Sequence, residues 1–338
     1  MLALGVWIIA AFTSKNRQFL SNRFGGKRKS DNIFRAIVII AAAYTVLMVS
    51  LVAFSVLRGS IEIFSYEGII GFLTGTDWNA VEGRESFGAL PYIVGTLVSS
   101  AIAMVIGVPI SLGIATFVSE MSPPRFAAPI SFVIELLAAV PSIIYGLWAL
   151  FVFRFWIRDL IEMPLYNTFH WIPIFDKYPF GLDVFTAGIV LAIMIIPIIS
   201  SICREVMRVV PNSQREAAYS LGATRWEAVR IAVFPYAKAG ILGAAILGLG
   251  RAVGETILVT MIIGNVIGIA AIPTTLFSQS QTLSSLIANE FNEASSDLHL
   301  SALIGLGAVL LILTMIINIG ARLLVRKMVK VPAGDKKK

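Results

Sequence analysis

Six long apolar segments limit this chain to one class of fold. They cover residues 36–57, 90–118, 126–153, 184–202, 239–263 and 300–321, and four of them contain no charged residue. A helix needs about 20 mostly apolar residues to cross the hydrocarbon core of a bilayer. Because lipid offers no hydrogen-bond partners to the backbone, such segments cross as complete helices. The sequence therefore predicts an all-α, polytopic transmembrane helical bundle with six core spans.

The composition agrees with a lipid environment. Charged residues make up 14% of the chain, whereas a soluble globular protein contains about 25%. The net charge of +7 comes from basic residues that lie between apolar segments, so we expect a membrane protein and no nucleic-acid partner. A single cysteine, Cys203, excludes an internal disulfide. The two histidines, His170 and His299, lie far apart in the sequence, so we expect neither a metal centre nor a cofactor.

The basic residues also predict the orientation. If residues 13–35 are cytoplasmic and the six spans alternate, 21 of the 27 Lys and Arg residues lie on the cytoplasmic side. Only five lie in the outer loops, which is a strong positive-inside signal. This places the loop 203–238 and the basic tail 326–338 in the cytoplasm. The domain organisation expected is an N-terminal region at 1–35, a permease domain at 36–325 and the tail.

Two segments do not fit the simple alternation of spans. Residues 1–12 are apolar but cover only about 18 Å as a helix, which is too short to cross. An uncleaved signal, the remnant of a seventh span and an artefact of the start site all stay open, and we favour an additional membrane-associated segment. Residues 264–289 are uncharged but contain Gly, Pro and several Ser and Thr. They predict a turn and a short amphipathic helix that is re-entrant or lies on the outer side of the bundle.

The polar loop at 211–235 carries unusual local signals. Ser213 with Glu216, and Thr224 with Glu227, each have the spacing of a capping box, which satisfies unpaired N–H groups at a helix N-terminus. Gly222 lies just before the second box. We therefore predict two short helices joined at a glycine bend, in a loop structured enough to dock another protein.

The same loop resembles a known motif. Glu216, Ala217, Ala218, Gly222 and Pro235 match in register the EAA loop of ABC importer permeases, E-A-A-x3-G-x9-I-x-L-P, while two distal positions of that pattern depart. The resemblance implies that these five residues form the coupling loop that docks an ATPase. The alternative is an ordinary amphipathic helix at the membrane surface, which does not require this spacing.

Further stretches narrow the resemblance. The sequences at 134–151, 246–265 and 285–294 resemble the permeases of phosphate ABC transporters, the PstC family. Membership would imply a type I ABC importer fold and ATP-driven uptake of phosphate. It would also imply four partners besides lipid and phosphate: a second, PstA-like permease, two copies of a PstB-like ATPase and an external PstS-like phosphate-binding protein.

Three charges lie inside predicted spans, where each costs about 2.5–3.5 kcal/mol if it is unpaired. Arg251 and Glu255 are four residues apart, so they could pair on one helix, and Glu135 lies in another span. We expect Arg251 to offer its guanidinium to a passing phosphate, with Glu255 and Glu135 limiting how tightly the ion is held. The alternative is a set of structural ion pairs that hold the helices together.

Other functions fit the sequence less well. The chain has no Walker A motif and no H-E-x-x-H motif, so we expect no enzyme activity in this chain and ATP hydrolysis in a separate partner. Two alternatives to phosphate import stay open. One is a permease for another oxyanion such as sulfate or molybdate, and the other is a standalone secondary transporter or channel, for which an EAA loop has no use.

Overall fold

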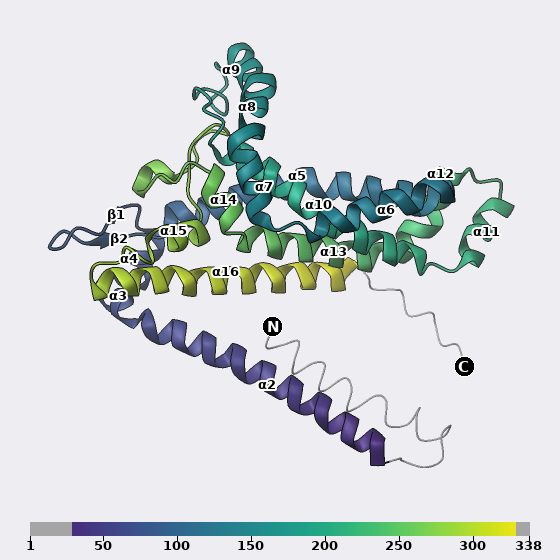
Figure 1. The fold of residues 1–338 in the computed structure, drawn as a ribbon, viewed down its shortest axis with the longest axis horizontal. Coiled ribbons are helices and arrows are strands. Elements are labelled where there is room, and N and C mark those ends of the chain that lie inside the picture. Colours follow the sequence, from purple (N-terminus) through teal and green to yellow (C-terminus); the bar gives the residue numbers. More distant parts are fainter. Residues whose placement is uncertain (1–28, 329–338) are drawn as a thin grey trace.

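The computed structural model describes residues 29–328, and it is almost entirely helical (Figure 1). A single two-stranded sheet, in which Trp78 pairs with Phe87, is the only sheet in this range. The elements in chain order are α2 (Lys29–Gly59), α3 (Ile61–Tyr66), α4 (Ile69–Thr74), β1 (Trp78–Asn79), β2 (Ser86–Phe87), α5 (Leu90–Thr116), η1 (Phe117–Met121), α6 (Pro124–Ala139), α7 (Ser142–Trp148), η2 (Ala149–Phe153), α8 (Arg154–Ile157), η3 (Arg158–Glu162), α9 (Met163–Phe169), α10 (Val184–Arg208), α11 (Asn212–Ser220), α12 (Arg225–Ala228), η4 (Val229–Val233), α13 (Phe234–Gly254), α14 (Ile257–Ile262), η5 (Gly268–Ala271), α15 (Leu283–Glu290) and α16 (Asp297–Met328).

Five continuous helical segments of the described range are long and apolar enough to cross a membrane: Ile33–Gly59, Leu90–Met121, Val184–Arg208, Arg225–Gly254 and Asp297–Val325. A sixth span results if one bent helix pair is counted as a single span. The predicted helical bundle is therefore confirmed. Four predicted spans, those at 36–57, 90–118, 184–202 and 300–321, each lie within one continuous helical segment, although α2, α10 and α16 extend six or seven residues beyond a predicted end.

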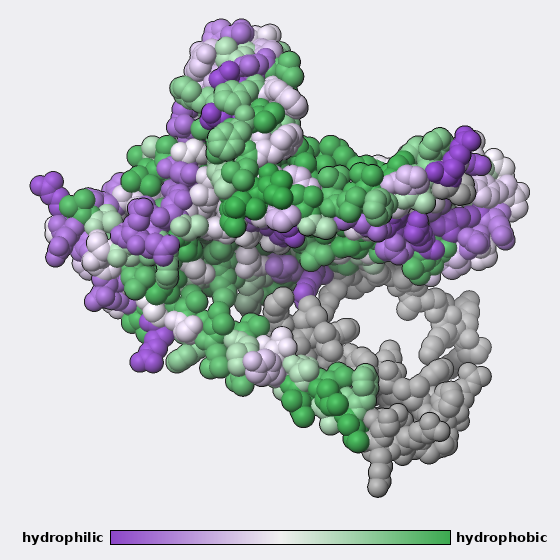
Figure 2. Space-filling model, in the orientation of Figure 1, coloured by the Kyte–Doolittle hydropathy of each residue, from purple (hydrophilic) through white to green (hydrophobic). Residues whose placement is uncertain are grey.

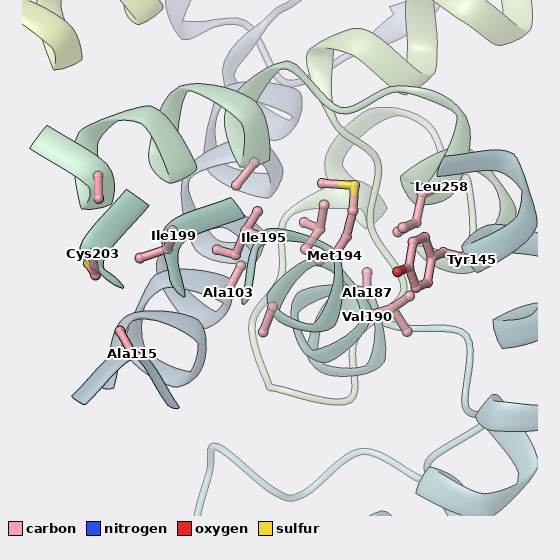
Figure 3. Packing of buried hydrophobic residues seen from close by; sticks show 14 of the residues in the cluster. Ala103, Ala115, Tyr145, Ala187, Val190, Met194, Ile195, Ile199, Cys203 and Leu258 are labelled. Carbon is pink, nitrogen blue, oxygen red and sulfur yellow. The ribbon is translucent and has the colours of Figure 1, made fainter. Parts of the chain in front are cut away.

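Helix α10 forms the centre of the bundle, packed against α5, α6 and α13. Its inner residues are buried, among them Val190, Met194, Ile195 and Ile199 (Figure 3). Small residues allow the close approach of its neighbours: a Cβ added at Gly248 of α13 would lie 2.4 Å from Ile199. Hydrophobic side chains cover the flanks of the bundle, whereas hydrophilic ones gather at its two ends (Figure 2).

The span predicted at 126–153 is wrong as a single helix. Helix α6 ends at Ala139, and the chain turns by 91° before a second helical segment runs from Ser142 to Phe169. Pro141 explains the break, because it has no N–H to donate and disfavours the helical conformation at Val140. The second segment continues far beyond the predicted end and projects from the side of the bundle (Figure 1).

The span predicted at 239–263 is also broken. Helix α13 begins earlier, at Phe234, and ends at Gly254, and the extended backbone of Glu255 (ψ 128°) separates it from the short helix α14. The polar loop at 203–238 lies at one end of the bundle (Figure 1). The segments 58–89 and 264–299 lie together at the other end, as the predicted orientation requires.

The segment 264–289 lies against the bundle, and the predicted amphipathic helix is confirmed as α15. Leu283 and Leu286 are fully buried in a second apolar cluster, together with residues of α3, α4, α5 and α16. The N-terminus of α15 is closed by a capping box between Thr282 and Ser285. The N-terminal residues 1–28, the tail 329–338 and the predictions made for them lie outside the described residues.

Candidate coupling loop and intramembrane charges

Two short helices joined at a glycine form the loop at 211–235, as predicted. Helix α11 ends in a Schellman motif, in which Gly222 donates to the carbonyl of Tyr219 (2.9 Å) and Ala223 to that of Ala218 (3.2 Å). Gly222 has a φ of 84°, which only glycine adopts without strain. Helix α12 then starts at Arg225 and continues through η4 into the span α13.

One of the two predicted capping boxes is present. The Glu227 carboxylate accepts from the backbone N–H of Thr224 (2.7 Å), and the Thr224 hydroxyl accepts from the N–H of Glu227 (3.4 Å). The hydrogen bonds from Thr224 hold the pKa of the Glu227 carboxyl below its ordinary value. The box predicted for Ser213 and Glu216 is wrong. Helix α11 begins at Asn212, so Ser213 lies within its first turn and cannot act as the N-cap.

The five residues of the EAA pattern differ in exposure. Glu216 and Ala217 are exposed, whereas Ala218 is buried, with 5% of its surface accessible. Gly222 is exposed at the bend, and Pro235 is exposed in the first turn of α13. Exposed apolar side chains surround them, since Tyr219, Leu221, Trp226 and Ile231 are 46–86% accessible. This arrangement leaves one polar and several apolar groups free to contact another molecule.

A groove of about 920 Å³ separates this loop from the inner end of α5. Its walls include Arg208, Tyr219 and Arg225, and an ion pair between Arg215 and Glu120 (2.8 Å) lies among them. No motif in the sequence predicts this pair. Its partners are 95 residues apart, and only the position of Arg215 beside the EAA pattern pointed to it.

Among the intramembrane charges, Glu135 pairs with a residue that the sequence analysis did not consider. Its carboxylate accepts a 2.7 Å hydrogen bond from Nη2 of Arg204, which lies near the inner end of α10. The Arg204 side chain is only 6% accessible, but that of Glu135 is 59% accessible. A carboxylate on a membrane helix is strongly disfavoured against lipid. The exposed side of Glu135 therefore requires a polar neighbour outside this chain, such as water or another subunit.

Arg251 and Glu255 do not lie on one helix, so the ion pair that their spacing would allow does not form. Helix α13 ends at Gly254, and neither side chain belongs to an ion pair within residues 29–328. Arg251 is exposed in the last turn of α13, where a cation complements the negative end of the helix dipole. Glu255 is half-buried, and its backbone carbonyl accepts from the Ser284 hydroxyl (2.9 Å). The guanidinium of Arg251 is thus presented on the surface of the bundle.

Residues 107–330 match the family described as the binding-protein-dependent transport system inner membrane component. The match covers the C-terminal part of α5 and every element from η1 to α16, including the coupling loop and Arg251. The chain belongs to this family. As a family member with several membrane-spanning helices, it is a multi-pass transport protein of the inner membrane.

Named relatives cover nearly the whole chain. The sequence is 45% identical over 302 residues to the phosphate transport system permease protein PstC of Pasteurella multocida, which covers 88% of this chain and 92% of the relative. The PstC protein of Mesorhizobium japonicum is 43% identical over 297 residues, with 87% and 89% covered. A solved bacterial ABC transporter that imports alginate has a TM-score of 0.51 at 15% identity, covering 88% of this chain and all of that one. This likeness shows the permease fold alone.

Proposed function

We propose that this chain is the membrane permease subunit of an ATP-driven importer of inorganic phosphate. The observation that carries the proposal is a sequence identity of 45% and 43% to two phosphate permeases. Each alignment covers nearly the full length of this chain and of the relative. The exposed EAA loop supports it, because a permease driven by an external ATPase needs a cytoplasmic surface for docking. The other subunits would be a second, PstA-like permease, two copies of a PstB-like ATPase and a PstS-like phosphate-binding protein outside.

In this proposal the loop 203–238 docks the ATPase. Glu216 offers a carboxylate to a basic residue of the partner, and Ala217 leaves a low surface for close packing. Ala218 packs inward and Gly222 sets the bend, so these two residues hold the shape of the docking surface. Pro235 lies where the loop enters α13, so movement of the loop reaches that span directly.

Arg251 would meet phosphate on its way through the membrane. A guanidinium presents a planar fork of donors that matches two phosphate oxygens, and Arg251 is exposed on the bundle. Glu255, four residues further, would limit how long the anion stays. Glu135 would contribute less than the sequence analysis assumed, because its carboxylate is already paired with Arg204.

Uptake measurements test the substrate. Deleting the gene should abolish high-affinity uptake of labelled phosphate, and restoring this chain should bring it back, with sulfate and molybdate failing to compete. If sulfate or molybdate competes at equal concentration, the alternative oxyanion permease is correct. If reconstituted chain transports phosphate without any ATPase, it is a standalone carrier.

The Arg251 assignment has its own test. The change Arg251→Ala should lower phosphate uptake about tenfold or more, since a charge-assisted contact to the substrate is lost. Arg251→Lys should be intermediate, because a lysine keeps the charge but not the fork. The amount of ATPase that co-purifies should be unchanged in both variants. Full uptake by Arg251→Ala would exclude Arg251 from the phosphate path.

A further inference from the structure

One arginine ties the coupling helix α11 to two spans at once. Arg215 donates from Nε and Nη2 to the two carboxylate oxygens of Glu120, at 2.9 and 2.8 Å. Its Nη1 and Nη2 also donate to the carbonyls of Val210 (2.6 Å) and Met207 (2.9 Å), and Nη1 further donates to Asn212 Oδ1 (3.3 Å). A guanidinium has five N–H groups, so every donor of this side chain has an acceptor.

The acceptors come from separate parts of the bundle. Glu120 lies in η1, which continues α5 without a break, whereas the carbonyl of Met207 lies in the last turn of α10 and that of Val210 two residues beyond its end. The negative end of the helix dipole favours a cation at this position. The side chains of Arg215 and Glu120 are 16% and 7% accessible, so water screens this pair less than it screens a surface salt bridge.

Other connections between α11 and α5 are sparse. Helix α11 packs against α12 and η4 of its own loop, and within residues 29–328 its only hydrogen bonds to η1 are those of Arg215. The bidentate geometry also fixes the orientation of Arg215 relative to Glu120, because two parallel hydrogen bonds resist rotation of the guanidinium against the carboxylate. A displacement of α11 therefore reaches α5 chiefly through one side chain.

We propose that the Arg215–Glu120 pair is the coupling clasp of this permease, which transfers movement of the ATPase-docking helix α11 to the span α5. The inference rests on the proposed function, since it requires an ATPase at this loop. Arg215 is a positioning residue here. It precedes Glu216, faces the spans and not the partner, and keeps α11, η1 and the end of α10 moving as one unit.

The experiment uses the complete importer reconstituted in lipid vesicles with its ATPase and binding protein. Arg215→Lys keeps the charge and loses the fork, and Glu120→Gln keeps the size of the side chain and loses the charge. Both variants should hydrolyse ATP and co-purify with the ATPase within about twofold of the wild type. The amount of phosphate moved per ATP hydrolysed should fall about tenfold, as loss of one charge-assisted pair implies.

Controls separate the clasp from docking and from folding. Arg158→Lys changes an arginine that pairs with Asp159 (2.8 Å) in η3, outside the loop 203–238, and should leave phosphate moved per ATP unchanged. The double variant Arg215→Lys with Glu120→Gln should be no worse than either single one, since the two residues act as one link. Unchanged transport per ATP in both single variants would overturn the clasp. So would loss of ATPase co-purification in Arg215→Lys, because Arg215 would then act in docking. A wild-type complex that binds no ATPase would instead refute the proposed function, and the clasp with it.

Discussion

The two ends of this bundle hold their loops by different chemistry. At the outer end, the segment that precedes α15 and the first turn of that helix are buried and neutral: Ser278, Ser280, Gln281, Thr282, Ser284 and Ser285 are all at most 5% accessible. At the cytoplasmic end, α11 and α12 are largely exposed and held by the charged pair of Arg215 and Glu120. A buried network of short side chains fixes one geometry. A single long charged pair can move with the helix that it connects.

The difference fits a transporter that is driven from one side. Local stability is lowest where few apolar groups are buried, and in the coupling loop those groups are few, with Ala218, Ala228, Val229 and Val233 among them. The outer segment instead packs against an apolar cluster that includes Tyr92, Leu283 and Leu286. We therefore expect substitutions at the outer end to destabilise the whole bundle and substitutions in the loop to affect coupling.

The largest expected effect is at Gly95, where α5 contacts the outer segment. A Cβ at Gly95 would lie 2.2 Å from the backbone carbonyl oxygen of Gln281, which cannot move aside as a flexible side chain would. Gly95→Ala should therefore destabilise the protein by about 3 kcal/mol. The measurement is the thermal unfolding midpoint of the purified protein in detergent.

Gly113 in the same helix is the matched control. A Cβ there meets nothing within 4 Å, so Gly113→Ala should be neutral or stabilising by up to about 1 kcal/mol, as alanine favours a helix over glycine. If Gly95→Ala and Gly113→Ala unfold at the same temperature, the outer segment is not fixed against α5 and the contrast between the two ends fails.

A smaller effect is expected at Gly222 in the coupling loop. Space is not limiting, since nothing lies within 4 Å of an added Cβ, but the φ of 84° strains any other L-residue. Gly222→Val should cost about 1–2 kcal/mol locally, opening the loop and lowering co-purification of the ATPase. The unfolding midpoint of the bundle should stay unchanged.

Asparagine tolerates this backbone region better than other residues with a side chain, so Gly222→Asn should retain most ATPase binding. Equal loss of binding in both variants would mean that the glycine contacts the partner directly, and that its role is not to set the bend.

Local signals were readable in the sequence, and long-range pairings were not. Thr224 and Glu227 lie three residues apart and form the predicted box, and Gly222 marks a helix end. Ser213 and Glu216 have the same spacing but form no box, because α11 begins one residue before Ser213. From the sequence we expected Glu135 to act together with Arg251 in the phosphate path. In the structure its carboxylate instead pairs with Arg204, 69 residues away. Such a pairing depends on how α6 and α10 pack, which hydropathy does not encode.

The breaks in the spans show the same limit. The missing N–H of Pro141 is a sequence signal for the end of α6. The 91° turn that follows depends on how the two helices pack, and no local sequence pattern predicts it. The end of α13 at Gly254 gave no hydropathy signal, because the stretch 239–263 is mostly apolar even though Arg251 and Glu255 flank the break. The helix instead stops where Glu255 adopts an extended backbone and its carbonyl accepts from Ser284.

The smallest expected effect concerns the pH dependence of the coupling loop. Because the pKa of Glu227 is lowered in the folded loop, its ionised form stabilises α12 at pH values above its unfolded pKa of about 4.3. That contribution disappears as the pH falls through the lower, folded pKa. Glu227→Gln should therefore reduce the hydrogen-exchange protection of the α12 amides at pH 6, and the difference from wild type should shrink as the pH is lowered below about 4.

The outer end supplies the contrast for this measurement, since the capping box of α15 uses Thr282 and Ser285, neither of which ionises in this range. After correction for intrinsic exchange rates, the protection of α15 should be the same in wild type and Glu227→Gln at both pH values. A wild-type difference in α12 that persists unchanged at low pH would show that the shape of Glu227, and not its charge, holds the box. The N-terminus of α12 would then be capped by hydrogen bonds that need no charge, as the N-terminus of α15 is.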